Sequence, residues 1–179
     1  MHKLAARAES GRPVRAGLIG AGKFGSMFLS QVPTIPGLEV AVIADLDVDR
    51  ARAVCRSIGW DEQRIARTRF VDSGLEACAG DGVEVVIEAT GSPVAGVTHA
   101  LAAIEASRHI VMVNVEADAL VGPLLAAKAR ERGVVYSMAY GDQPALVAEM
   151  VDWARAAGFT VAAAGKGTKY LPLYHTVRP

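Results

Sequence analysis

Short, nearly continuous apolar runs alternate with longer alanine-rich segments along this chain of 179 residues. An apolar run without polar alternation is typical of a strand that is covered on both faces, as in a parallel sheet. Regular alternation of such strands with helices predicts βαβ units with right-handed crossovers. We therefore expect an α/β fold of the Rossmann type: a doubly wound, mainly parallel sheet with helices on both faces.

The segments of this predicted sheet are defined by their apolar and β-branched content. The predicted strands are Val14–Ile19, Leu38–Ala44, Val83–Ala89, His109–Asn114, Val134–Met138 and Phe159–Ala164. The predicted helices are Lys23–Gln31, Asp49–Ile58, Ser73–Ala79, Val94–Ser107, Gly122–Arg132 and Pro144–Ala157. Residues 60–71 are the least regular part of the pattern, and we interpret their arginines as a solvated face.

Composition excludes several classes of function. Lys+Arg and Asp+Glu each number 19, so the chain lacks the basic excess of a nucleic-acid binder. No apolar run approaches the roughly 20 residues of a membrane helix. Residues 1–13 have no apolar signal core, which predicts a mobile tail on a cytoplasmic protein. Cys55 and Cys78 match neither a metal spacing nor a disulfide framework, so we expect two buried thiols and no metal site.

A glycine-rich turn follows the first predicted strand. It reads Gly20-Ala21-Gly22-Lys23-Phe24-Gly25 and opens the first predicted helix, which is the context in which G-x-G-x-x-G indicates a dinucleotide site. Gly20 permits a tight turn, Gly22 keeps side chains away from the pyrophosphate, and Gly25 lets the helix lie close to the strand. The helix N-terminus then offers unpaired N–H groups to the phosphates. All six residues are candidates for cofactor binding, the alternative being a plain glycine turn.

An acid directly follows the second predicted strand, 20 residues after Gly25 (25 to 45). Asp45 is placed to accept hydrogen bonds from both hydroxyls of an adenosine ribose and to repel a 2′-phosphate, which favours NAD. Arg50 and Arg52 lie close enough in sequence to accommodate NADP instead. A further alternative is that Asp45 or Asp47 caps the next helix.

Polar residues follow the other strands as well. In an open α/β sheet, ligands bind beyond the carboxyl ends of the strands. Thr90 and Gly91 follow the third predicted strand and are expected to border the nicotinamide half of the cofactor. The candidates for orienting substrate, relaying a proton or binding an anionic group are Glu116, Asp142, Lys166 and Lys169. The alternatives are helix caps and turn residues for the acids and ordinary solvation for the lysines.

Several segments resemble the homoserine dehydrogenase-like family, and in particular the branch whose longer members carry a C-terminal SAF domain. These segments are, in order, GLIGAGKFG, VIADLD, VVIEATGSP, HIVMVNVEAD, YSMAYGDQP and AGKGTKYLP. The resemblance implies an NAD(P)-dependent oxidoreductase with an N-terminal Rossmann domain and a following domain for substrate contacts and dimerisation. Asn114 matches the asparagine of the family's Asn–Lys pair, which implies a part in cofactor binding. Val115 stands at the lysine position, which counts against homoserine as substrate.

From these features we expect a mobile tail at 1–13, an NAD(P)-binding domain at 14–165, and the start of an absent substrate domain at 166–179. The predicted activity is hydride transfer between NAD or NADP and a small hydroxy or oxo substrate, with a phosphorylated substrate included. Three origins of such a chain stay open: a truncated gene product, an excised domain, or one chain of a split enzyme. Two kinds of assembly stay open as well: a homo-oligomer, or a complex with a partner chain that supplies the missing domain. Two alternative functions are a non-catalytic NAD(P)H-binding module and an enzyme similar to sugar-phosphate reductoisomerases.

Overall fold

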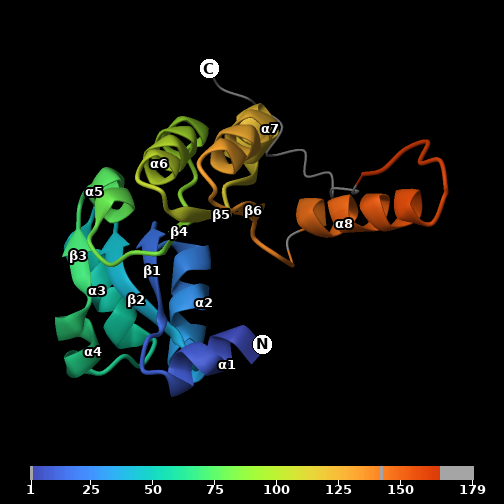
Figure 1. The fold of residues 1–179 in the computed structure, drawn as a ribbon. Helices are drawn as coiled ribbons and strands as arrows, with labels where there is room; N and C mark the ends of the chain where they lie inside the picture. The colour runs from blue at the N-terminus through green and yellow to red at the C-terminus, as the bar shows by residue number, and fades with distance from the viewer. Residues whose placement is uncertain (1, 142, 166–179) are drawn as a thin grey trace. The chain divides into compact units, whose positions relative to one another are not determined.

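A computed structural model describes residues 2–141 and 143–165 of the chain (Figure 1). The chain divides into two compact units, residues 1–139 and residues 140–179, which are treated separately below. The first unit contains all the strands of the described residues, and the second contains one described helix, α8 (Gln143–Ala156).

The first unit is built on a parallel sheet of six strands in the order β3-β2-β1-β4-β5-β6. The strands are β1 (Val14–Ile19), β2 (Leu38–Ala44), β3 (Arg69–Val71), β4 (Val85–Glu88), β5 (His109–Met112) and β6 (Tyr136–Met138). The chain runs outward from β1 to β3 on one side and then returns to place β4 on the other side of β1. This reversal is the topological switch point at which open α/β sheets bind ligands.

The register aligns the carboxyl ends of β1, β2 and β4, the three strands at the switch point. Ile19 at the end of β1 pairs with Ala44 of β2 on one side and with Glu88 of β4 on the other. The residues that follow these three strands therefore meet at one edge of the sheet.

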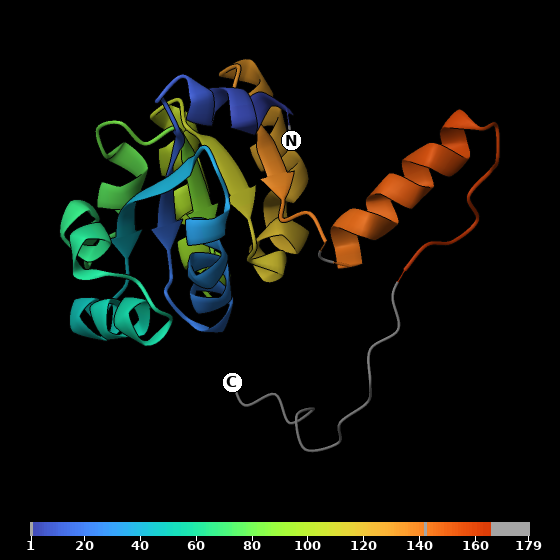
Figure 2. The same cartoon turned by 90° about the horizontal axis from the view of Figure 1, so that it is seen from below.

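Helices cover both faces of this sheet (Figures 1 and 2). Helices α2 (Lys23–Gln31), α3 (Val48–Ser57) and α4 (Glu62–Arg67) bury side chains in one apolar cluster, which includes Leu18, Leu29 and Cys55. The opposite face is covered by α5 (Gly74–Ala79), α6 (Pro93–Glu105) and α7 (Val115–Glu131). The predicted doubly wound fold is confirmed.

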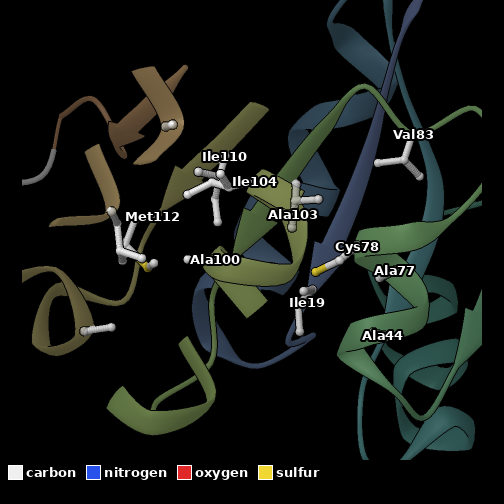
Figure 3. Close-up of a cluster of buried hydrophobic side chains, with 14 of the residues drawn as sticks. Ile19, Ala44, Ala77, Cys78, Val83, Ala100, Ala103, Ile104, Ile110 and Met112 are labelled. Carbon is white, nitrogen blue, oxygen red and sulfur yellow. The ribbon is translucent and has the colours of Figure 1, made fainter. Parts of the chain in front are cut away.

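The second apolar cluster packs α5, α6 and α7 against the sheet (Figure 3). Its members from α6 are mostly small, Ala100 and Ala103 beside Ile104, so the helix approaches the strands closely. Cys78 belongs to this cluster, and burial raises the pKa of its thiol to about 12. Both cysteines are buried and free, as predicted.

Four segments differ from the sequence-based expectation. Residues His2–Glu9 form a helix, α1, instead of a mobile tail, and Arg7 of this helix pairs with Glu84. The segment expected to be irregular contains α4 and β3, because Ile65 and Thr68 are buried although the arginines around them reach solvent. The last two differences concern α7 and the predicted sixth strand.

Helix α7 begins at Val115 rather than at Gly122, because Asn114 caps it. It is kinked at Val121 (φ −143°, ψ 15°), two residues before Pro123, and the predicted helix corresponds to the part after the kink. Residues 159–164 form no strand. Their apolar composition fits a strand, but a strand requires a hydrogen-bonded neighbour, and the described part of the second unit supplies only a helix.

Candidate dinucleotide site

The glycine-rich turn has the geometry that its sequence predicts. Gly20 has a φ of +97°, and a Cβ at this position would lie 2.8 Å from the carbonyl oxygen of Ala89. A Cβ at Gly25 would overlap the carbonyl oxygen of Gly20, so helix α2 rests directly on the turn. A Cβ at Gly22, in contrast, would meet nothing within 4 Å. Two glycines are required by the fold itself, whereas Gly22 leaves open space in front of the turn.

Helix α2 begins at this open space. Gly22 is its N-cap and provides no side chain to satisfy the first N–H groups. The N–H groups of a first helical turn have no intrahelical acceptor, and the helix dipole adds partial positive charge there. Lys23 and Phe24 occupy the first turn, and the side chain of Lys23 is exposed. The turn and the helix end together suit an anionic group such as a pyrophosphate.

Asp45 follows β2 and lies beside this turn. Its side chain is only 7% exposed, and its carboxyl accepts hydrogen bonds from the N–H of Ala21 (2.9 Å), the N–H of Asp47 (3.1 Å) and the guanidinium of Arg50 (2.9 and 3.0 Å). Burial alone would raise the pKa of Asp45, but the hydrogen bonds and charge of Arg50 and the two backbone donors lower it. The carboxyl is thus held as an acceptor at the end of β2.

Asp47, not Asp45, caps the next helix. Its Oδ1 accepts from the N–H of Arg50 at 2.9 Å, which defines the start of α3. Of the two acids that the sequence offered as a cap, Asp47 takes this role. The carboxyl of Asp45 remains at the cleft edge, where Arg50 now contacts it.

A cleft of about 500 Å³ opens beyond the carboxyl ends of β1 to β4. Its lining residues come from the ends of β1 and β2, from the loops after all four strands, and from the first turns of α3, α5 and α6. They are Ile19, Gly20, Gly22, Ala44, Asp45, Leu46, Asp47, Arg50, Asp72, Gly74, Ala89, Thr90, Gly91, Ser92, Ala95 and His99. Five of the predicted cofactor-binding residues thus share one cleft: Gly20, Gly22, Asp45, Thr90 and Gly91. Ala21 contributes its N–H to Asp45, and Lys23, Phe24 and Gly25 form the helix start behind the turn.

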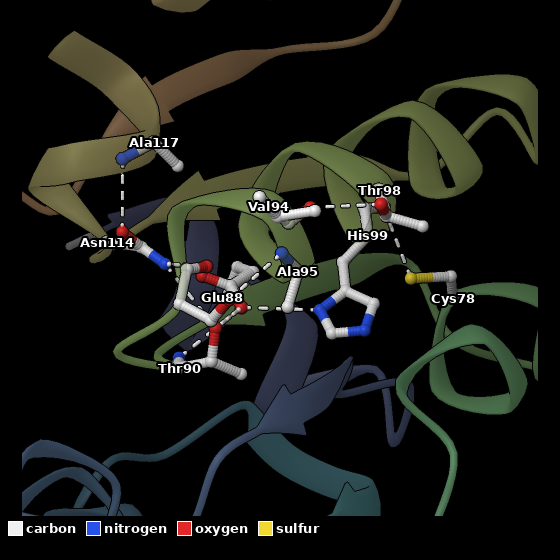
Figure 4. A network of polar contacts seen from close by, with 10 residues as sticks. Cys78, Glu88, Thr90, Val94, Ala95, Thr98, His99, Asn114 and Ala117 are labelled. Atoms are coloured by element: carbon white, nitrogen blue, oxygen red, sulfur yellow. Dashed lines mark hydrogen bonds and ion pairs between the residues drawn. The ribbon is translucent and has the colours of Figure 1, made fainter. Parts of the chain in front are cut away.

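A buried polar network supports the Thr90 side of the cleft (Figure 4). Glu88, the last residue of β4, is fully buried, and its Oε1 accepts from the N–H and the hydroxyl of Thr90. The same oxygen lies 3.3 Å from Nδ1 of His99 on α6. Oε2 of Glu88 has no hydrogen-bond partner among the described residues. A buried carboxyl at a cleft is costly without donors, and here Thr90 supplies two donors to one oxygen, with Nδ1 of His99 within hydrogen-bond distance of the same oxygen.

Asn114 belongs to this network rather than to the cleft lining. Its side chain is buried, and Nδ2 donates to the carbonyl of Ser92 (2.9 Å) and to the Thr90 hydroxyl (3.4 Å). Its Oδ1 accepts from the N–H of Ala117 at the start of α7. The carboxamide therefore ties the β4–α6 turn to α7. Any part of Asn114 in cofactor binding would act through the position of Thr90 and Ser92.

Of the four predicted substrate residues, the structure describes only Glu116. Glu116 is exposed in the first turn of α7 and does not line the cleft. Asp142, Lys166 and Lys169 lie outside the described residues. The pair of Glu88 and His99 was missed by sequence reasoning, because an acid inside an apolar strand and a histidine 11 residues later carry no motif.

Comparisons with known proteins find similarities to oxidoreductases. Residues 141–179 match the family described as "Oxidoreductase DRL, catalytic domain". Inositol 2-dehydrogenase 3 of Saccharopolyspora erythraea is 32% identical over 98 residues, which is 54% of this chain and 26% of that protein. This chain therefore spans about a quarter of the length of the curated relative that it matches.

Solved structures share the fold. A homoserine dehydrogenase from Thiobacillus denitrificans superposes with a TM-score of 0.59 and 20% identity over 70% of this chain and 29% of that chain. Biliverdin reductase from Synechocystis sp. PCC 6803, in complex with biliverdin and NADP+, gives a TM-score of 0.55 and 19% identity over 70% of this chain and 37% of that chain. At this identity the likeness concerns the fold, a Rossmann-type α/β domain. Within the part of the chain that the structure describes, no helix has the length and apolar character needed to cross a membrane.

Proposed function

We propose that this chain binds a nicotinamide dinucleotide and forms the cofactor-binding part of an NAD(P)-dependent oxidoreductase. The observation that carries the proposal is the cleft itself. The glycine-rich turn, the carboxyl of Asp45 and the Thr90–Gly91 loop line one space at the topological switch point of the sheet. The match of residues 141–179 to an oxidoreductase catalytic domain supports the same class of function.

In this proposal the dinucleotide lies across the ends of β1, β2 and β4. The pyrophosphate rests on the open space at Gly22, where the first N–H groups of α2 bind its oxygens. The adenosine ribose donates its hydroxyls to Asp45. Thr90 and Gly91, held by Glu88 and Asn114, border the nicotinamide half. The bound cofactor supplies the hydride chemistry, and the protein orients it.

The pair of Asp45 and Arg50 bears on the choice of cofactor. Asp45 favours the free 2′-hydroxyl of NAD, because a carboxylate repels a 2′-phosphate. Arg50, whose side chain is 53% exposed, supplies a guanidinium that pairs well with phosphate if it leaves Asp45. We propose NAD as the preferred cofactor and NADP as a weaker one.

The substrate class follows from the resemblance to the homoserine dehydrogenase-like family. We propose a small hydroxy or oxo compound, with Glu116, Asp142, Lys166 and Lys169 as candidates for orienting it, relaying a proton or binding an anionic group. Three of these four lie within residues 141–179, the segment that matches the catalytic-domain family. A cytoplasmic location remains a prediction.

Calorimetric titration of the chain with NADH and NADPH tests the proposal. We expect micromolar binding of NADH that is lost in Gly22→Asp, because the new carboxylate would occupy the phosphate position. Gln63→Glu is the matched control, since it adds the same charge on an exposed position of α4. Absence of binding to either nucleotide, or equal binding by the Gly22→Asp variant, would contradict the proposal.

A further inference from the structure

A second cavity lies near the amino ends of β1 and β2, at the opposite edge of the sheet from the dinucleotide cleft. It has a volume of about 220 Å³ and is lined by residues of β1, β2 and α4 and of the segments beside them. Arg15 and Glu39, which pair in register near the starts of β1 and β2, belong to its lining. The proposed function assigns no role to this cavity.

The cavity exists because β3 covers only part of β2. β3 pairs with residues 42–44, so residues 38–41 have no strand on that side within the described part of the chain. The segment after α4 takes this place, and the hydroxyl of Thr68 donates to the carbonyl of Val40 at 3.3 Å. Ala41 is an extra residue in the register with β1, and bulges of this kind bend a strand. A hollow therefore remains beside the first half of β2.

Arg64 is held at this cavity by a buried aromatic ring. Its guanidinium carbon lies 5.6 Å from the centre of the Trp60 ring, and Trp60 is only 5% exposed. Nε1 of Trp60 donates to the carbonyl of Leu29 at 2.9 Å, which fixes the indole. The face of an indole attracts a cation. The positive charge of Arg64 is therefore kept at the cavity.

The acids at the start of α4 are engaged elsewhere. The carboxyl of Glu62 binds Arg56 of α3 at 2.8 Å. Asp61 is the N-cap of α4, and its Oδ1 accepts from the backbone N–H of Arg64. Neither carboxyl forms an ion pair with the guanidinium of Arg64, which is left to other partners.

The lining of the cavity has an excess of positive charge. Arg15, Arg64 and Arg67 all line it, and among the described residues none of the three forms an ion pair. Glu39 lines the same cavity and offsets one of these charges. The remaining excess favours an anion.

We propose that this cavity binds a small anion that carries a phosphate group. Guanidinium groups pair with phosphate through parallel N–H donors, and arginines from separate elements can share the several oxygens of one phosphate. The volume is below the roughly 300–1,000 Å³ of sites for drug-sized ligands, which suits a phosphate or pyrophosphate group rather than a dinucleotide. Val40 lies roughly 16 Å along β2 from Asp45, so both sites can be filled at once. The inference does not depend on the proposed function.

Calorimetric titration with inorganic pyrophosphate tests the site in the Gly22→Asp variant, whose carboxylate keeps the probe away from the glycine-rich turn. We expect one pyrophosphate to bind per chain, and to bind about tenfold more weakly after Arg64→Gln or Arg67→Gln, because each change removes a charged donor. Arg130→Gln is the matched control, since it removes the same charge at an exposed position of α7 outside the cavity lining. Absence of binding, or an equal loss in the control, would overturn the proposal.

Glu39→Gln provides a test in the opposite direction. Removal of this acid should strengthen pyrophosphate binding several-fold, and a gain of affinity cannot come from a damaged fold. Unchanged or weaker binding would place the probe outside the cavity and overturn the proposal. Citrate, which carries a similar negative charge on carboxylates, should bind more weakly than pyrophosphate. Equal binding of citrate would overturn the assignment of a phosphate group.

Discussion

The N–H of Ala21 donates to Oδ2 of Asp45 at 2.9 Å, across 24 residues of sequence. This bond joins the glycine-rich turn after β1 to the end of β2. The two parts of the candidate site that would contact pyrophosphate and ribose are therefore held together by the protein itself. Preorganisation of this kind reduces the ordering that binding would otherwise require.

The carboxyl of Asp45 should make stability depend on pH in acid. Burial would raise its pKa, but Arg50 and the N–H groups of Asp47 and Ala21 lower it below the ordinary value of 3.8. The folded chain then binds this proton less readily than the unfolded chain. The stabilisation is complete above the unfolded-state pKa and is lost as pH falls through the lower folded-state pKa.

Asp45→Asn tests this linkage. We expect the variant to be less stable than the parent chain near neutral pH, and the difference in unfolding free energy to shrink toward about pH 2. Urea unfolding at a series of pH values gives the difference directly. A difference that stays constant down to the acid end would show that the charge of Asp45 does not contribute.

Two glycines of the same turn should behave differently when changed to alanine. Gly25→Ala places a Cβ against the carbonyl of Gly20 and should destabilise the fold by roughly 1–3 kcal/mol. Gly22→Ala meets nothing within 4 Å and should leave the unfolding midpoint nearly unchanged while weakening NADH binding. Thermal unfolding and calorimetric titration of both variants separate the effects. Equal losses of stability would contradict the geometry of the turn.

Arg50 should influence NADP more than NAD. Its guanidinium now contacts both oxygens of Asp45 and would be the nearest partner for a 2′-phosphate. We expect Arg50→Gln to reduce NADPH affinity by about tenfold and to change NADH affinity less, because only NADPH carries the phosphate. Arg52→Gln is the matched control, since Arg52 pairs with Asp49 and does not line the cleft. Equal losses for the two nucleotides would remove Arg50 from cofactor selection.

Sequence patterns predicted the parts of the fold that depend on local periodicity. β1, β2 and α2 have the bounds that the sequence indicated, because continuous apolar runs next to a glycine-rich turn leave few alternatives. The Gly20–Gly25 turn and Asp45 were found in the same way. Helix α4 and strand β3 were missed, because only Ile65 and Thr68 are buried within residues 61–71 and the exposed residues around them hide the period.

The polar network depended on packing that no local pattern reports. Glu88 meets His99 only because α6 docks over the end of β4, and Asn114 reaches Ser92 only because α7 starts beside that turn. Asn114 was selected through a family resemblance, but its contacts are those of a helix cap and a tether. Side chains that act through tertiary contacts of this kind cannot be assigned from spacing alone.

The acceptor at Glu88 should matter more than its charge. Glu88→Gln keeps an oxygen for the N–H and hydroxyl of Thr90 and for Nδ1 of His99, although its new amide must lie where Oε2 now has no partner among the described residues. We expect a loss of roughly 1 kcal/mol in unfolding free energy. Glu88→Leu removes the acceptor from the N–H and hydroxyl of Thr90 and the polar contact of Nδ1 of His99. It should cost about 3 kcal/mol or more, because buried polar groups are left unsatisfied.

Urea unfolding of both Glu88 variants measures these costs, and NADH titration of the folded variants measures the effect on the cleft. Glu105→Gln, an exposed acid at the end of α6, is the control and should change stability by less than about 0.5 kcal/mol. Because Thr90 borders the cleft, the more stable variant should also bind NADH more tightly, so we expect Glu88→Gln to bind NADH better than Glu88→Leu. A Glu88→Leu variant as stable as Glu88→Gln would mean that the two Thr90 donors find other acceptors, and that Glu88 does not hold the Thr90 loop in place.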